Sequence, residues 1–251
     1  MMKSNLTYRY HYNERTVLVI IAMVHYYATL KRYYCILYHP VPPIKAVSAV
    51  WKTSETATKD RRYTGDNMSI NTLAEGIHWV GAVDWHVRDF HGYSTMEGTT
   101  YNAFLIIDEK ITLIDTVKPS HRQDLMHRIR EIIDPEKIDY IVVNHVELDH
   151  AGCLAEMMEV AKPEKLICSP MGKNAIISHF HQEDWPFEVV KSGDEISLGK
   201  RTLSFLETRM LHWPDSMFTY AKEDGILFTS DAFGQHIATS ERFDDEVSLS
   251  Q

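Results

Sequence analysis

Cysteine is scarce in this chain of 251 residues, which contains three: Cys35, Cys153 and Cys168. No two of them form a Cys-x-x-Cys pair, so the sequence offers no disulfide framework. Cys153 and Cys168 fall in a predicted helix and a predicted strand, where we expect small buried side chains. This usage fits a reducing compartment, and we expect a cytoplasmic protein.

The chain also has fewer basic than acidic residues and lacks long apolar runs. The formal net charge is −9 and the isoelectric point is near 5.8, which disfavours nucleic acid as a partner. The apolar run Val17 to Val24 is shorter than the roughly 20 residues of a membrane span, so we expect no membrane partner. An exported form stays open as an alternative, because Arg9 and Arg15 precede this run as in a signal peptide, although no clear cleavage site follows.

The charge divides the chain near residue 67. Residues 1–67 contain ten Lys and Arg against four Asp and Glu, a formal charge of +6, which leaves −15 for the remainder. They also hold nine of the thirteen tyrosines. We interpret residues 1–67 as an N-terminal extension of uncertain structure and residues 68–251 as the folded domain. A chain of this length can bury one α/β core.

Four side chains of metal-ligand type fall within six residues just after the apolar run 140–143: His145, Glu147, Asp149 and His150. If the apolar run is a buried strand, the turn after it is free of strand pairing and can direct all four towards one point. The Ala-Gly pair at 151–152 allows close backbone approach before the helix predicted by the apolar spacing after it. A solvated acidic turn is the alternative, but four such side chains would rarely fall so close by accident.

Two further strand ends add candidates. His212 follows His145 by 67 positions (212 − 145) and lies just past the predicted strand Thr202 to Glu207. Asp231 follows the apolar run 225–229, at a position where a carboxylate can bridge two metal ions. A lone aspartate at a strand end is more often a turn or capping residue. Together with the other two segments, a bridging ligand is the better interpretation.

Strands and helices alternate along the domain, which argues for an α/β sandwich with two layers of strands and helices outside. Besides the elements already named, we expect strands at 77–83, 103–107, 111–115, 166–168, 187–190 and 195–198, and a helix at 172–179. The segments 103–107 and 111–115 are expected to form a hairpin, and 187–190 and 195–198 a second strand pair. A capping box at Ser120 to Gln123 is expected to open another helix.

Short motifs run in order from Ile77 towards the C-terminus. They are Trp79-Val80-Gly81, Asp84-Trp85, Arg88-Asp89-Phe90-His91-Gly92, Gly98-Thr99-Thr100-Tyr101-Asn102, Leu113-Ile114-Asp115-Thr116, His145-x-Glu147-x-Asp149-His150-Ala151-Gly152, Leu211-His212-Trp213-Pro214-Asp215-Ser216-Met217 and Asp231-Ala232-Phe233-Gly234-Gln235-His236. The series resembles the N-terminal domain of flavodiiron proteins, also called A-type flavoproteins or flavorubredoxins. The resemblance implies a metallo-β-lactamase-like αβ/βα sandwich.

The resemblance also implies roles for the candidate residues. His145, Glu147 and His212 would hold one iron ion, Asp149 and His150 the other, and Asp231 would bridge the two. In some members of the family the histidine at the position of His150 does not coordinate. His91 would lie near the metal pocket as a catalytic residue that donates a hydrogen bond to a bound diatomic molecule; a structural hydrogen bond is the alternative. Trp213 and its neighbours Met210 and Met217 are expected in the pocket wall and the core.

Glu147 favours iron on chemical grounds. Hydrolytic relatives of this fold carry His-x-His-x-Asp-His, and here the second histidine is replaced by Glu147. A site richer in carboxylates suits iron better than a histidine-rich zinc site does. The resemblance therefore implies an oxidoreductase that reduces oxygen to water, nitric oxide to nitrous oxide, or both.

The sequence departs from the family beyond Asp231. Twenty residues follow (251 − 231), and the last histidine ligand of the family lies further on, so the second iron is expected to lack a protein ligand. The flavodoxin-like domain that binds FMN is not found either, and in the family the FMN of one subunit faces the di-iron site of the other. We expect the truncated front part of such an enzyme, homodimeric when full length, with a rubredoxin-type or flavin-linked electron donor.

Two alternatives stay open. The chain could be a zinc hydrolase of the same fold that uses metal-bound hydroxide as its nucleophile. It could also be an inactive remnant. The fold alone does not decide, because one scaffold can host both redox and hydrolytic chemistry.

Overall fold

The computed structural model describes residues 45–47, 71–90, 92–243 and 246. The chain divides into two units, Met1–Pro40 and Val41–Gln251, and all described residues belong to the second. None of the helices in the described ranges is long and apolar enough to cross a membrane.

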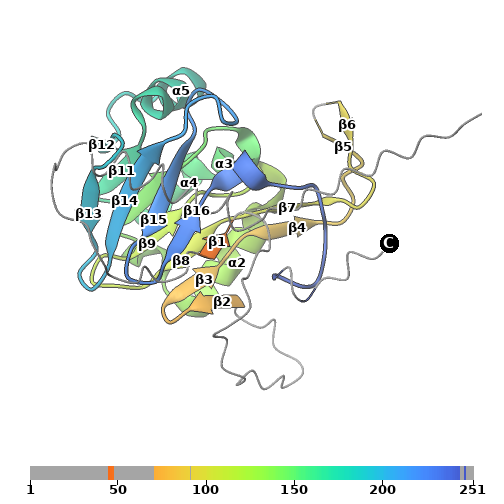
Figure 1. Ribbon diagram of the computed structural model, residues 1–251, viewed down its shortest axis with the longest axis horizontal. Coiled ribbons are helices and arrows are strands. Elements are labelled where there is room, and N and C mark those ends of the chain that lie inside the picture. The colour runs from red at the N-terminus through yellow and green to blue at the C-terminus, as the bar shows by residue number, and fades with distance from the viewer. Residues whose placement is uncertain (1–44, 48–70, 91, 244–245, 247–251) are drawn as a thin grey trace, which may run out of the picture. The chain divides into compact units, whose positions relative to one another are not determined.

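The second unit is built from short strands and few helices (Figure 1). The strands are β1 (Lys45–Val47), β2 (Asn71–Ala74), β3 (Ile77–Trp79), β4 (Ala82–Asp84), β5 (Asp89–Phe90), β6 (Tyr93–Ser94), β7 (Thr99–Tyr101), β8 (Phe104–Ile106), β9 (Thr112–Ile114), β10 (Tyr140–Val143), β11 (Lys165–Cys168), β12 (Phe187–Val189), β13 (Glu195–Ser197), β14 (Thr202–Glu207), β15 (Met217–Ala221) and β16 (Ile226–Phe228). The α-helices are α2 (Arg122–Ile132), α3 (Leu148–Ala151), α4 (Leu154–Ala161) and α5 (Pro170–Phe180). The 3-10 helices are η1 (Pro119–His121), η2 (Pro135–Lys137) and η3 (Ser230–Phe233).

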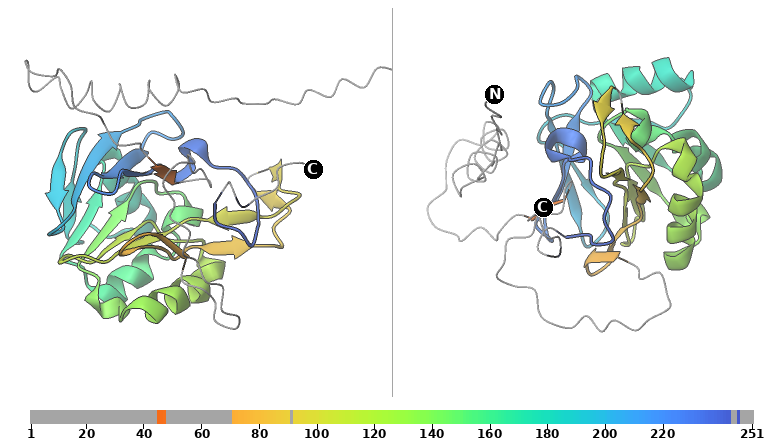
Figure 2. Two further views of the ribbon diagram at one scale, coloured as in Figure 1. Left: turned by 60° about the horizontal axis from the view of Figure 1, so that its bottom comes forward. Right: turned by 90° about the vertical axis from the view of Figure 1, so that its right-hand side faces the viewer.

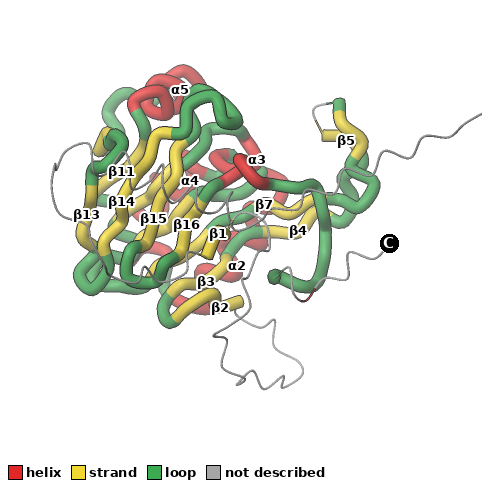
Figure 3. Tube along the Cα trace, viewed as in Figure 1, coloured by secondary structure: helices red, strands yellow, loops and turns green. Residues whose placement is uncertain are grey.

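Most strands belong to two sheets, whose strands are yellow in Figure 3. One sheet has seven strands in the order β12-β11-β10-β9-β8-β3-β2, and the other has five in the order β1-β16-β15-β14-β13. In the larger sheet β9, β10, β11 and β12 run parallel, which requires crossover connections through helices. Two small ribbons, β4 with β7 and β5 with β6, extend from this body.

The core has two parts, separated by the seven-stranded sheet. Successive side chains of a strand point to opposite faces, and β10 follows this rule with both faces buried. Ile141 and Val143 join a cluster with residues of α2, α4 and α5, whereas Tyr140 and Val142 join the cluster between the two sheets. Figure 2 shows α2, α4 and α5, green to teal, on the side of the seven-stranded sheet that faces away from the smaller sheet. The two facing sheets with helices outside confirm the predicted α/β fold class, and Cys153 and Cys168 are buried in this core as expected.

Several local predictions are correct. The strand Thr202–Glu207 has the predicted bounds, and β8 and β9 form the expected antiparallel hairpin. The predicted strand 77–83 is instead two strands, β3 and β4, with a break at Val80 and Gly81. A Cβ atom on Gly81 would lie 2.1 Å from the carbonyl oxygen of Tyr101, so the chain bends where only glycine fits.

Two predictions about pairing and capping are wrong. The segments 187–190 and 195–198 do not pair with each other: β12 extends the larger sheet beside β11, and β13 pairs with β14 in the smaller one. Ser120 opens no capping box, because it lies in η1, and α2 begins after His121 without a side-chain cap.

The described part of the proposed N-terminal extension, residues 45–47, forms a strand. Within residues 1–67 the strand β1 pairs in parallel with β16, with Lys45 opposite Ile226 and Val47 opposite Phe228. This segment was expected to belong to an extension of uncertain structure, and the pairing shows that residues 45–47 join a sheet of the domain. The domain boundary at residues 67 and 68 stays a prediction.

Candidate metal centre

The turn that follows β10 is anchored to both sheets through Asn144. The backbone N–H of Asn144 donates to Oδ1 of Asp115 at 2.7 Å, and its carbonyl oxygen accepts from the N–H of Met217 at 3.0 Å. The Thr219 hydroxyl donates to its side-chain oxygen at 2.7 Å. Asp115 directly follows β9 of the larger sheet, and residues 217–219 lie in β15 of the smaller one, so these bonds hold the start of the ligand turn at a fixed place between the layers.

The turn continues into the short helix α3, where the backbone packs closely against the segment that follows β9. Thr116 donates its N–H and its hydroxyl to the carbonyl oxygen of His150, which ties α3 to the end of β9. A Cβ atom on Gly152 would lie 2.3 Å from the carbonyl oxygen of Leu148 and 2.4 Å from Cδ of Pro119. The close approach expected at the Ala-Gly pair is therefore present, and it depends on the missing side chain.

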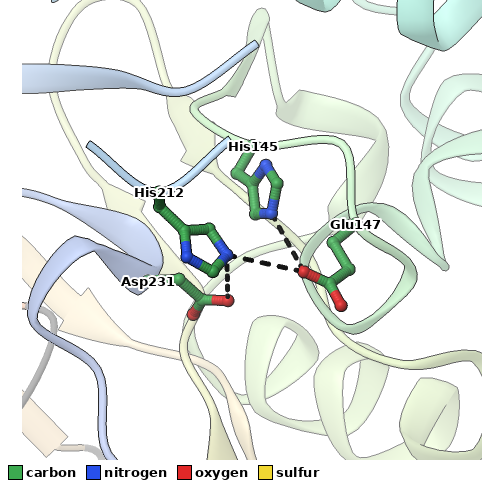
Figure 4. A group of neighbouring side chains, drawn as sticks. All are labelled: His145, Glu147, His212 and Asp231. Carbon is green, nitrogen blue, oxygen red and sulfur yellow. Dashed lines mark hydrogen bonds and ion pairs between the residues drawn. The ribbon is translucent and has the colours of Figure 1, made fainter. Parts of the chain in front are cut away.

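A first group of donor atoms comes from three strand ends: His145 after β10, Glu147 before α3, His212 between β14 and β15, and Asp231 in η3 after β16 (Figure 4). One donor atom from each residue lies within 4.8 Å of the others. Nε2 of His145 lies 3.1 Å from Oε2 of Glu147. Nε2 of His212 lies 3.6 Å from the same oxygen and 3.5 Å from Oδ2 of Asp231. This spacing suits one metal ion between the four side chains.

A second group consists of Asp149, His150 and the same Asp231. Nε2 of His150 lies 2.7 Å from Oδ1 of Asp231 and 3.1 Å from Oδ2 of Asp149. Despite these short distances, both ring nitrogens of His150 and Oδ1 of Asp149 are buried and make no hydrogen bond within the described ranges. Buried polar atoms without hydrogen bonds are rare and call for an explanation such as an ion. The donor set therefore fits a metal on this side as well.

The charges of the two groups perturb one another. Burial alone lowers the pKa of His145, but hydrogen bonds to Asp215 and Glu147 outweigh it and raise the pKa to about 9. Burial also opposes the charge of His150, yet Asp231 and Asp149 hold its pKa well above the usual value. Asp231 shows the reverse: burial raises its pKa, and His150 brings it well below the usual range. The Asp231 carboxylate thus stays charged and attracts positive charge, either protons or metal ions.

Of the seven residues predicted for the site, the structure brings six together: His145, Glu147, Asp149, His150, His212 and Asp231. That they bind metal stays a prediction. The seventh, His91, lies outside the described residues, and its catalytic role stays a prediction too.

Trp213 lies beside the histidines rather than in the core. Its ring centroid is 5.4 Å from that of His145 and 6.2 Å from that of His212. Met217 is buried as expected, but Met210 is 72% exposed and Trp213 is 48% exposed. Trp213, beside the histidines, and Met217, in the core, agree with the expectation of pocket wall and core. The expectation is wrong for Met210, because the 208–216 loop carries this side chain to the surface.

One residue of the site was missed by the sequence reasoning. Asp215 is buried, and its Oδ2 lies 2.9 Å from Nδ1 of His145. A possible signal is its place three residues after His212, within a loop already expected to carry a ligand.

Comparisons with known proteins agree with this geometry. A family profile described as "ODP family beta lactamase" matches residues 99–249. The chain belongs to this family. The Rubredoxin-oxygen oxidoreductase of Megalodesulfovibrio gigas is 53% identical over 181 residues, which cover 72% of this chain and 45% of that protein. The Nitric oxide reductase of Moorella thermoacetica is 50% identical over 177 residues, 70% of this chain and 44% of that protein.

A solved structure gives the same assignment. The flavodiiron protein from Giardia intestinalis superposes with a TM-score of 0.70 and is 40% identical, and the match covers 74% of this chain and 46% of that one. The chain is therefore a flavodiiron-family sequence that matches the β-lactamase-like part of these proteins. It spans less than half the length of the curated relatives named above.

Proposed function

We propose that this chain provides the di-iron site of a flavodiiron reductase that reduces oxygen to water, nitric oxide to nitrous oxide, or both. The observation that carries the proposal is the convergence of His145, Glu147 and His212 on one side of Asp231, and of Asp149 and His150 on the other. Asp231 belongs to both groups through different oxygens, as a bridging ligand would.

The composition of the donor set favours iron. The two groups together offer three carboxylates and three imidazoles. A carboxylate-rich set is harder than the histidine-rich sets of zinc hydrolases, and hard oxygen donors suit iron. Iron held at both positions by these residues would supply the redox chemistry that passes electrons from a donor to a diatomic substrate.

The residues of the chain itself have three tasks in this proposal. The sheet-anchored turn at Asn144 keeps His145 and Glu147 in place. Asp231 places its two oxygens towards different groups. The low pKa of Asp231 keeps this carboxylate ionised and ready to hold a cation.

The proposal includes a source of electrons for the metal site. By the family resemblance, electrons arrive from an FMN that a partner subunit presents to the site in a homodimer, with a rubredoxin-type or flavin-linked donor upstream. The names of the relatives, one a rubredoxin-oxygen oxidoreductase and one a nitric oxide reductase, support both substrates. The zinc hydrolase is less well supported, because the relatives reported above carry reductase names.

Metal analysis tests the identity of the site. Protein expressed in iron-replete medium should contain iron in preference to zinc. Purified protein with one or more zinc ions per chain and no iron would overturn the redox function and favour hydrolysis.

A pair of anaerobic assays tests the electron supply. With the same reductant, we compare this chain alone with a longer version that continues into a flavodiiron FMN domain. We expect negligible reduction of oxygen or nitric oxide by the chain alone and turnover by the longer version, because the FMN connects the donor to the metal site. Equal turnover in both would contradict this account of the electron path.

A further inference from the structure

Asp215 makes two hydrogen bonds with a single carboxylate oxygen. Its Oδ2 accepts from Nδ1 of His145 at 2.9 Å and from the backbone N–H of Val146 at 2.8 Å. The carboxylate is therefore bound both to the imidazole ring and to the backbone that carries it. Movement of the ring relative to the turn would break one of the two bonds.

The backbone of Asp215 is fixed from the other side. Its carbonyl oxygen accepts from the Ser169 hydroxyl at 2.7 Å, and Oγ of Ser169 accepts from the N–H of Gly172 at 2.9 Å in the first turn of α5. Both Asp215 and Ser169 are buried. The carboxylate that faces His145 thus stands on a rigid element rather than on a free loop.

The hydrogen bond to Asp215 decides which ring nitrogen of His145 can bind a metal ion. A ring that donates its Nδ1 proton to a carboxylate leaves Nε2 as the nitrogen with a lone pair once the ring is neutral. Nε2 is the atom that faces Glu147, at 3.1 Å. An acidic acceptor also makes the imidazole a stronger ligand.

We propose that Asp215 is a positioning residue of the metal centre. It holds His145 with Nδ1 protonated and Nε2 directed at the first donor group, and it couples the turn after β10 to the loop that carries His212. The inference rests on the proposed function only in that the donor groups bind metal; it holds for iron, zinc or cobalt alike.

Three variants of the full chain test it, with Co²⁺ as the probe of affinity and Zn²⁺ for proton-detected nitrogen spectra of the histidine rings. Asp215→Ala should weaken Co²⁺ binding about 10- to 100-fold and remove the slowly exchanging Nδ1 proton signal of His145. Asp215→Asn keeps an acceptor oxygen but loses the charge, so it should keep the proton signal and lose less affinity. Ser169→Ala removes the anchor of the loop but leaves the carboxylate in place, so it should keep the signal and lose less affinity than Asp215→Ala.

Two outcomes would overturn the proposal. One is unchanged Co²⁺ affinity and an unchanged His145 signal in every Asp215 variant that folds. The other is an equal loss of affinity in Ser169→Ala and Asp215→Ala, which would show that Asp215 acts only by anchoring the loop. Wild-type protein that binds no Co²⁺ would overturn this proposal and the metal site together. Binding of Co²⁺ with the expected variant pattern, but without reductase activity in the longer protein, would remove only the proposed function.

Discussion

The strand β16 has an aspartate beyond each of its ends, and the two sit in opposite surroundings. Asp224, before the strand, accepts from Nε and Nη2 of Arg201 at 2.8 and 3.2 Å. The same guanidinium lies 3.6 Å from Asp108, whose carboxylate also accepts the N–H groups of Glu109, Lys200 and Arg201. Every acid in this cluster has a cation or several backbone donors.

Asp231, after the strand, faces histidine ring nitrogens in the described structure: Nε2 of His150 at 2.7 Å and Nε2 of His212 at 3.5 Å. Beside it, buried atoms of Asp149 and His150 make no hydrogen bond within the described ranges. The comparison separates two uses of buried charge. A cluster whose charged groups all have partners within the protein contributes to the fold. A cluster in which buried nitrogen and oxygen atoms converge without hydrogen bonds is suited to bind an added cation.

The largest effect on stability is expected in the cluster before β16, where Arg201 pairs with Asp108 and Asp224. Arg201→Met leaves the partly buried Asp108 and Asp224 without their guanidinium and should lower the free energy of unfolding by about 3 kcal/mol. Denaturant unfolding of the metal-free protein measures this loss. Metal affinity should stay that of the wild type, and a parallel loss of metal binding would show that the two ends are not independent.

Metal loading should change the stability by a slightly smaller amount, and only through the donor groups around Asp231. An ion that binds only the folded state stabilises it by about 2.7 kcal/mol at a hundredfold excess over its Kd. The melting temperature of the wild type and of Arg201→Met should therefore rise equally on loading. If His145→Ala showed the same rise as the wild type, the ion would be binding elsewhere.

The change of melting temperature with pH should differ between the metal-free and the metal-loaded protein, and this effect is expected to be smaller than the two before it. In the metal-free protein the pKa of His145 is raised to about 9, above its ordinary value of about 6.5. A raised pKa contributes stability that is complete below pH 6.5 and is lost as the pH rises through 9. Melting temperatures measured over this window should fall for the metal-free protein and not for the loaded one, because the metal replaces the proton. A flat metal-free profile would contradict the environment assigned to His145.

The fold could be predicted where the decisive information was local. The strand Thr202–Glu207 follows from its alternating apolar residues. The hairpin of β8 and β9 follows from two short apolar runs on either side of a short polar turn. The partners of β12 and β13 could not be predicted in this way, because a hydrophobic pattern shows that a segment is a strand and not which sheet it joins. For the same reason, the sequence of Lys45–Val47 does not indicate that this segment pairs with β16.

The candidate site shows the same limit. Ligand-type residues that follow a strand directly, such as His145 and Asp231, could be named from the sequence because strand ends gather functional side chains. Asp215 could not be assigned a role, since its contact with His145 spans 70 positions and depends on how the 208–216 loop folds back. The lack of hydrogen bonds at His150 is likewise a property of the packed structure and leaves no trace in the sequence.

The most direct test of the central claim counts iron ions per chain after anaerobic reconstitution with Fe²⁺, in the wild type, in Asp231→Ala and in Asp224→Ala. The two variants remove the same side chain from opposite ends of β16. We expect Asp231→Ala to lower occupancy at both metal positions, because the ligand is shared, and Asp224→Ala to keep the wild-type iron content. Loss of only one of two ions in Asp231→Ala, or an equal loss in Asp224→Ala, would contradict a two-metal site built around Asp231.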